Sequence, residues 1–211
     1  MCIDGVEMGI KKIALLASGS GSNVENMVRY FAGKEGWEFP LILSNKAEAY
    51  VHERAKNLKI PSFTIPKAGF ECGDALELLQ QYAIDFIVLA GFLLKIPANV
   101  LQAYPDKIIN IHPALLPKYG GKGMYGMYVH EAVVAHRETE TGITIHYVDE
   151  NYDEGRIIFQ ARCDVLPADT AEDVADKVHA LEYRYFPEVI EKVLLEQFPR
   201  RSSTPQELYR I

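Results

Sequence analysis

The chain has 211 residues, of which 48% are hydrophobic and 24% charged, and its formal net charge is −7. These values are typical of a globular protein with one sizeable core, and no apolar run approaches the roughly 18 residues that a membrane span needs. Proteins that bind nucleic acid usually carry a basic surface, so the acidic balance argues against DNA or RNA as the main partner. Small molecules are therefore the expected partners, with no nucleic acid and no membrane.

The three cysteines, Cys2, Cys72 and Cys163, are few and widely spaced. They match neither a disulfide framework nor a paired zinc motif, which is typical of a reducing compartment. The first nine residues carry Asp4 and Glu7 and lack the basic and apolar regions of a signal peptide. We therefore expect a cytoplasmic protein.

The first half of the chain alternates between strand-like and helix-like segments. Short apolar runs predict strands at residues 12–17 (KIALLA), 40–43 (PLIL), 60–65, 85–90 (DFIVLA) and 107–111. The segments between them predict helices at residues 23–31, 47–58, 74–82 and 98–103. Strands that alternate with helices favour a parallel sheet covered on both faces.

The pattern changes in the second half. Two strand-like runs, 142–148 and 156–165, are joined by a polar loop and predict an antiparallel pair added to the sheet. A long helix is expected from Thr170 to about residue 195, because Asp169 or Thr170 can cap its start. Glu172 and Asp173 are favourable in its first turn.

Together these elements predict an α/β fold with an open, mostly parallel Rossmann-like sheet and an antiparallel C-terminal strand pair. We expect one domain over residues 1–198, with a phosphate-binding half at about 10–110 and a catalytic half at about 110–198. The polar residues 199–211 are expected to form a peripheral tail.

A glycine-rich loop, residues 18–23 (SGSGSN), lies between the first predicted strand and the first helix. Glycines allow close approach to a ligand, and the helix start offers unpaired N–H groups and a positive dipole end, so a phosphate is the expected ligand. A plain tight turn is the alternative. Val24 occupies the third glycine position of the dinucleotide fingerprint, and Ser44-Asn45 ends the second strand without an acidic residue, so a phosphomonoester fits better than NAD.

Asn110 and His112 lie two residues apart at the end of a predicted strand, so their side chains point to the same side. Pro113 ends the strand. An amide beside an imidazole suits acyl transfer, because the amide can stabilise an oxyanion and the imidazole can move a proton. A hydrogen-bonded structural pair is the alternative.

The loop at residues 149–155 (DENYDEG) carries four carboxylates. One of them near His112 would favour the imidazolium and raise the pKa of that histidine. A solvated acidic turn is the alternative. A second cluster, His130 to His136 (HEAVVAH), is not expected to bind zinc, because residues six apart lie about 120° apart around a helix.

From about residue 12 to 195 the chain resembles the folate-dependent phosphoribosylglycinamide formyltransferase family. The matching segments are SGSGSN at 18–23, LSNK at 43–46, VLAGF at 88–92, INIHPALLPKY at 109–119, GITIHYV at 142–148 and YDEG at 152–155. The resemblance implies the formyltransferase fold and transfer of a formyl group from 10-formyltetrahydrofolate to the amine of glycinamide ribonucleotide, a step of purine synthesis. It implies no metal, and it leaves open whether the protein is a monomer or a homodimer.

The resemblance also implies roles for individual positions. The catalytic residues would be Asn110, His112 and Asp153. The nucleotide would contact Gly21, Ser22, Asn23, His179, Ala180, Leu181 and Glu182. The folate would contact Leu93, Leu94, Lys95, Ile96, Asn110, Asp149, Glu150, Asn151, Tyr152 and Asp153. Leu94 stands where many members carry an arginine, and Lys67 is a weak candidate to replace another arginine that reaches the folate tail.

Other activities share parts of this pattern. Methionyl-tRNA formyltransferase usually adds a C-terminal tRNA-binding domain, and formyltetrahydrofolate hydrolase usually has an N-terminal regulatory domain, whereas this sequence has only short flanks. Formyl transfer to a sugar nucleotide or another amine is a further alternative. A non-catalytic module would bind folate or nucleotide without turnover, and would tolerate loss of His112.

Overall fold

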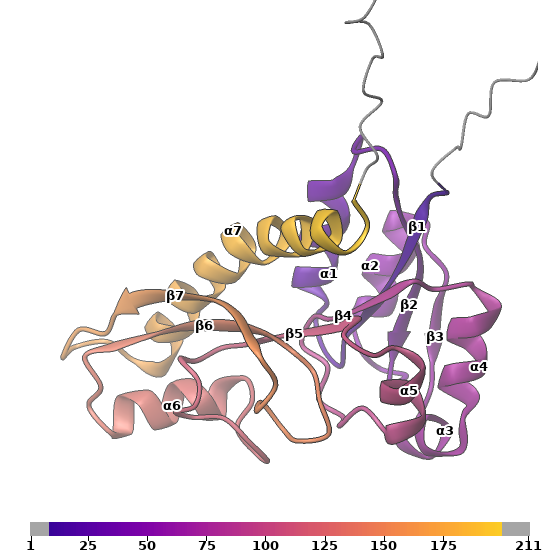
Figure 1. The fold of residues 1–211 in the computed structure, drawn as a ribbon. Helices are drawn as coiled ribbons and strands as arrows, with labels where there is room; N and C mark the ends of the chain where they lie inside the picture. Colours follow the sequence, from indigo (N-terminus) through magenta and orange to yellow (C-terminus); the bar gives the residue numbers. More distant parts are fainter. Residues whose placement is uncertain (1–8, 200–211) are drawn as a thin grey trace, which may run out of the picture.

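The computed structural model describes residues 9–199 and arranges seven strands in the order β3-β2-β1-β4-β5-β6-β7 (Figure 1). The strands are β1 (Lys11–Leu16), β2 (Trp37–Ser44), β3 (Ser62–Thr64), β4 (Phe86–Leu89), β5 (Ile108–His112), β6 (Glu140–Tyr147) and β7 (Ile157–Asp164). β1 to β5 are parallel, and β6 pairs antiparallel with both β5 and β7. The expected mostly parallel sheet with an antiparallel C-terminal pair is confirmed.

Seven helices surround the sheet within residues 9–199 (Figure 1). They are α1 (Ser22–Phe31), α2 (Val51–Leu58), α3 (Lys67–Cys72), α4 (Asp74–Gln81), α5 (Ala98–Ala103), α6 (Met127–Ala135) and α7 (Ala171–Gln197). The sequence does not predict α3, which has only six residues, or α6, which follows a glycine-rich segment and whose N-cap residue, Gly126, provides no side-chain cap.

Alternating side chains of the central strands build a core on each face of the sheet. Ile13 and Leu15 of β1 pack with α1, α2 and α7, whereas Ala14 and Leu16 pack with α3, α4 and α5. All four residues of β4 are buried, as expected for a strand covered on both faces. The apolar runs of the sequence therefore form a sheet that helices enclose on both sides.

Two details explain where the observed elements differ from the predicted ones. β2 begins at Trp37 rather than at residue 40, and its pairing with β1 shifts between Lys12 and Ala14, so β2 has one extra residue around Pro40. Such a bulge is where a strand accommodates proline, which cannot donate to the ladder. At α7, the side chains of Thr170 and Asp173 form a capping box, as the sequence predicts.

The strand order reverses between β1 and β4, so the loops after β1, β4 and β5 meet at one edge of the sheet (Figure 1). Open α/β sheets bind ligands at this kind of edge. None of the helices in residues 9–199 has the length and apolar character that crossing a membrane requires. Of the expected tail at 199–211, residues 200–211 lie outside the described residues, so its peripheral position stays a prediction.

Candidate active site

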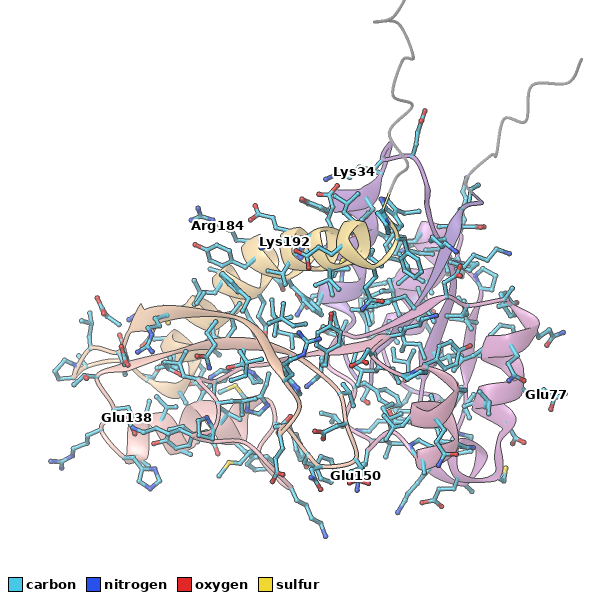
Figure 2. All side chains as sticks on the ribbon, viewed as in Figure 1. Lys34, Glu77, Glu138, Glu150, Arg184 and Lys192 are labelled. Atoms are coloured by element: carbon cyan, nitrogen blue, oxygen red, sulfur yellow. The ribbon has the colours of Figure 1, made fainter. Side chains whose placement is uncertain are left out.

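A cleft of about 560 Å³ opens at the edge where β1, β4 and β5 end. Five chain segments form most of its wall, namely residues 19–23, 89–96, 110–113, 121–126 and 151–153. Further polar side chains line it from β6, α6 and α7 or their flanks, namely the buried His146, His130 and Glu182 and the exposed Asp149 and His179. Figure 2 labels Glu150 on the loop between β6 and β7, which forms one rim. The structure thus brings loops from both halves of the chain to one cavity.

Asn110 and His112 project from β5 into this cleft, as their two-residue spacing predicts. The His112 ring is only 4% exposed. Its Nε2 lies 2.7 Å from the carbonyl oxygen of Tyr119, which can only accept a hydrogen bond, so Nε2 carries the proton. In the neutral ring Nδ1 is therefore the free base.

Asp153 lies beside His112. Its Oδ2 is 3.5 Å from His112 Nδ1 and accepts a hydrogen bond of 2.9 Å from the backbone N–H of Gly121. Asp153 has a left-handed backbone with φ of 56°, a conformation that Asp adopts more readily than most residues. Burial raises the pKa of this carboxyl, but the hydrogen bond and positive charge that the rings of His146 and His112 supply when they are protonated, together with the Gly121 N–H, outweigh burial and lower the pKa below its ordinary value. The carboxylate is thus ionised near neutral pH.

The pKa of His112 differs from the sequence-based expectation. Burial is the largest influence and lowers the pKa below the ordinary value of 6.5, and the neighbouring His146 acts in the same direction. Asp153 and the Tyr119 carbonyl raise it, as expected of a carboxylate, but they do not compensate for burial. His112 is therefore a neutral base at pH 7 and not a standing imidazolium.

The glycine-rich loop turns sharply at Gly21 before α1. Gly21 has a φ of 72°, and a Cβ built there would lie 2.5 Å from the Val51 side chain, so only glycine fits. Because Gly21 is also the N-cap residue, it supplies no side-chain cap to the first N–H groups of α1. Arg54 of α2 stabilises the loop, because its Nε donates a hydrogen bond of 2.8 Å to the carbonyl oxygen of Ser20. The N–H groups at the start of α1 therefore line the cleft, where they suit an anion such as a phosphate.

Asn23 and Glu182 connect this loop to α7. Asn23 Nδ2 donates to Glu182 Oε2 at 2.8 Å, and the Glu182 side chain is almost fully buried. Burial raises the pKa of Glu182, while Asn23 and His179 act in the opposite direction. Oδ1 of Asn23 is buried without a hydrogen-bond partner among residues 9–199. Polar atoms of this kind are available to a ligand.

Not every expected nucleotide contact reaches the cleft. Gly21, Ser22, Asn23, His179 and Glu182 line it. Ala180 is exposed away from the cleft wall, and Leu181 packs against the core that contains α1 and α7. Their positions follow from the helix period, because residues one and two positions before Glu182 point to other sides of α7.

The expected folate contacts divide in a similar way. Leu93 to Ile96, Asp149 and Asn151 to Asp153 line the cleft, whereas Glu150 faces an adjoining groove of about 600 Å³. Leu94, Lys95 and Lys67 also line that groove. Lys67 pairs with Glu71 at 3.5 Å, and Lys95 lies 5.9 Å from the ring centre of Tyr152.

The sequence does not predict two of the histidines that line the cleft. His146 of β6 is 2% exposed and contacts both Asn110 and Asp153. His130 of α6 is 1% exposed, and its Nδ1 has no hydrogen-bond partner within the described part of the chain. Burial, with smaller effects of His179 and His112, lowers the pKa of His130 to about 4. Because side chains alternate between the faces of a strand, the segment GITIHYV places His146 on one face. Its position opposite Asn110 depends on the β5–β6 register, which the sequence does not give.

No cluster of three or more histidine, cysteine, aspartate or glutamate side chains within residues 9–199 is arranged to bind a metal ion. The cleft brings together an amide, a neutral imidazole and a carboxylate near the N-terminal end of α1. Such a set can stabilise an oxyanion and move a proton, which are the two requirements of acyl transfer to an amine.

The chain belongs to the formyl transferase family, whose sequence pattern matches residues 11–190. Its relatives include enzymes named phosphoribosylglycinamide formyltransferase. One, from Bacillus subtilis, is 38% identical over 192 residues, which cover 88% of this chain and 95% of that protein. A chloroplastic one from Vigna unguiculata is 40% identical over 195 residues, covering 89% of this chain, and this chain spans only 62% of its length.

Solved structures agree with this placement. The crystal structure of phosphoribosylglycinamide formyltransferase from Bacillus halodurans superimposes with a TM-score of 0.81 at 33% sequence identity. The match covers 90% of this chain and all of that one. The α/β architecture expected from the sequence is therefore the architecture of this family.

Proposed function

We propose that the protein transfers the formyl group of 10-formyltetrahydrofolate to the amine of 5′-phosphoribosylglycinamide in purine biosynthesis. One observation carries the proposal. A single cleft holds a glycine-rich helix start suited to a phosphate at one side and Asn110, His112 and Asp153 at another. A nucleotide bound by its phosphate at the loop would thus extend its amine toward the acyl-transfer groups.

The nucleotide is proposed to bind along the loop and α7. Backbone N–H groups of Gly21, Ser22 and Asn23 would hold the phosphate. The Glu182 carboxylate and the unpartnered Oδ1 of Asn23 are both acceptors, so they suit the hydroxyl and amine hydrogens of a glycinamide ribonucleotide. His179 lines the same side of the cleft.

The folate is proposed to bind between Leu93–Ile96 and the loop at 149–153. Both segments line the cleft, and they combine apolar side chains with backbone polar groups, as a flat pterin ring requires. Leu94 and Lys95 lie where the cleft adjoins the second groove, so the folate tail would leave the cleft there.

We propose that Asn110, His112 and Asp153 carry out the chemistry. The glycinamide amine attacks the formyl carbon, and the carbonyl oxygen becomes an oxyanion that accepts a hydrogen bond from Asn110. Nδ1 of the neutral His112 accepts the proton that the amine releases. His112 then passes this proton to N10 of the folate as the bond from N10 to the formyl carbon breaks. Asp153 stabilises the imidazolium formed in between, because its carboxylate lies 3.5 Å from Nδ1.

The remaining sequence-based expectations stay part of this proposal. They are a single domain with a phosphate-binding half (10–110) and a catalytic half (110–198), a cytoplasmic location, reduced folate and nucleotide as partners without nucleic acid, no metal requirement, and a monomer or homodimer. A solution mass measurement decides between the last two.

Nucleotide dependence of folate release tests the proposal. The purified protein is mixed with 10-formyltetrahydrofolate, and tetrahydrofolate is measured with and without 5′-phosphoribosylglycinamide. We expect release only with the nucleotide, and loss of that release in His112→Ala. Equal release without nucleotide indicates the hydrolase, while no release from the wild-type protein indicates another acceptor or a non-catalytic binding module.

A further inference from the structure

His146 is the buried side chain nearest to Asn110 that the mechanism above does not use. The antiparallel register of β5 and β6 places His146 directly opposite Asn110. Side chains of directly opposed residues lie on the same face of a sheet. With 2% exposure, the His146 ring is held between Asn110 and the loop that carries Asp153.

The contacts of His146 define its tautomer. Nδ1 lies 2.9 Å from the carbonyl oxygen of Tyr147, which can only accept, so Nδ1 carries a hydrogen. In the neutral ring Nε2 then has only a lone pair. Asn110 Nδ2 lies 3.1 Å from this Nε2 and donates to it.

This tautomer determines how the Asn110 amide is turned. If the amide rotated by a half turn, its oxygen would face the lone pair of His146 Nε2, which is repulsive. The observed orientation uses one N–H of Asn110 for His146 and leaves the second N–H for the cleft, which Asn110 lines. An oxyanion hole needs its donor fixed in this way before the reaction begins.

We infer that His146 is a positioning residue, whose ring donates from Nδ1 to the Tyr147 carbonyl and accepts at Nε2, and so holds the Asn110 amide with an N–H directed at the formyl oxygen. The inference rests on the proposed function. Asp153 belongs to the same arrangement, because its Oδ1 lies 3.6 Å from His146 Nε2 while its Oδ2 faces His112. A proton on Nε2 would turn His146 toward Asp153 and remove the acceptor from Asn110.

The first test does not depend on activity. Two-bond ¹⁵N–¹H correlation spectra of the wild-type protein at pH 8 distinguish the two ring nitrogens of His146. We expect a protonated Nδ1 and an unprotonated Nε2. A hydrogen on Nε2 would overturn the inference even if the protein proves to be a formyltransferase, and the expected tautomer would stand if it proves to have another activity.

The second test is a double-mutant cycle on nucleotide-dependent formyl transfer. His146→Leu is expected to lower kcat at least about tenfold with both KM values little changed, and to have less than about a twofold effect in an Asn110→Ala background. His146→Gln offers an amide oxygen as a replacement acceptor and should restore most of the kcat. Equal losses in both backgrounds, or no recovery with glutamine in a folded protein, would contradict the assigned role.

Discussion

Nδ1 of His112 lies 3.5 Å from Oδ2 of Asp153, and this contact joins β5 to the loop between β6 and β7. Both side chains are largely shielded from water, so the carboxylate acts on the imidazole more strongly than an exposed pair would. Nevertheless burial keeps the pKa of His112 below 6.5. Before substrate binds, His112 is therefore a neutral base and Asp153 is an ionised carboxylate.

Asp153→Asn should lower kcat by about 100-fold and leave the nucleotide KM nearly unchanged, because the imidazolium loses its counter-charge. The acidic limb of the kcat/KM profile, which follows His112, should move to lower pH, since the carboxylate that raises the pKa of His112 is gone. Steady-state rates across pH measure both effects. Glu154→Gln, an exposed change in the same loop at a residue that does not line the cleft, is the control, and a limb that stays in place would contradict the pairing.

Gly21→Ala should destabilise the protein and raise the nucleotide KM. The substitution places a Cβ 2.5 Å from Val51 in a left-handed backbone, which costs about 1–2 kcal/mol for the conformation and about 1–3 kcal/mol for overpacking. Denaturant unfolding measures the loss. Gly19→Ala is the matched control for stability, since a Cβ there would have no atom of residues 9–199 within 4 Å. Similar unfolding midpoints for the two variants would show that Gly21 is not needed for the turn.

Glu182→Gln should raise the nucleotide KM about tenfold or more, because a buried carboxylate that accepts from Asn23 is replaced by an amide with fewer acceptor sites. The folate KM should change little. Glu188→Gln, an exposed position on the same helix, provides the comparison. An unchanged nucleotide KM in Glu182→Gln would remove Glu182 from the nucleotide site.

His130 should make folding stability depend on pH. Its pKa is about 4 in the folded protein, against 6.5 ordinarily, so the unfolded chain binds more protons between these values. Stability is then fully present above pH 6.5 and is lost as the pH falls toward 4, by up to about 3 kcal/mol.

Unfolding free energies at several pH values test this dependence. His130→Gln should flatten the slope between pH 4 and 6.5, and His136→Gln, exposed just after the same helix, should keep the wild-type slope. If the slope is the same in His130→Gln as in the wild type, protonation of His130 does not cause the loss of stability at low pH.

The sequence predicts the sheet well, because apolar runs and caps are local signals. The run at residues 85–90 contains β4, and Thr170 caps α7. The predicted start of β2 at residue 40 is wrong. Pro40 indicates a strand boundary in the sequence, but a bulge accommodates it inside the strand. α6 was missed because its glycine-rich approach and its Gly126 N-cap carry no helix-start signal.

The same distinction applies to the site. Asn110 and His112 can be found from the sequence because alternation in one strand is enough to place them together. His146 and His130 cannot, because their proximity to Asn110 and His179 depends on the β5–β6 register and on the packing of α6. Burial of His112, which determines the direction of its pKa shift, is likewise a property of the folded protein.

The destination of the formyl group tests the central claim most directly. 10-Formyltetrahydrofolate carrying a ¹³C-labelled formyl group is mixed with the protein and 5′-phosphoribosylglycinamide, and the label is followed by NMR. The account predicts that the label appears as the formamide of the nucleotide while tetrahydrofolate accumulates in equal amount. Label that appears as free formate, or that stays on the folate in the presence of the nucleotide, would contradict it.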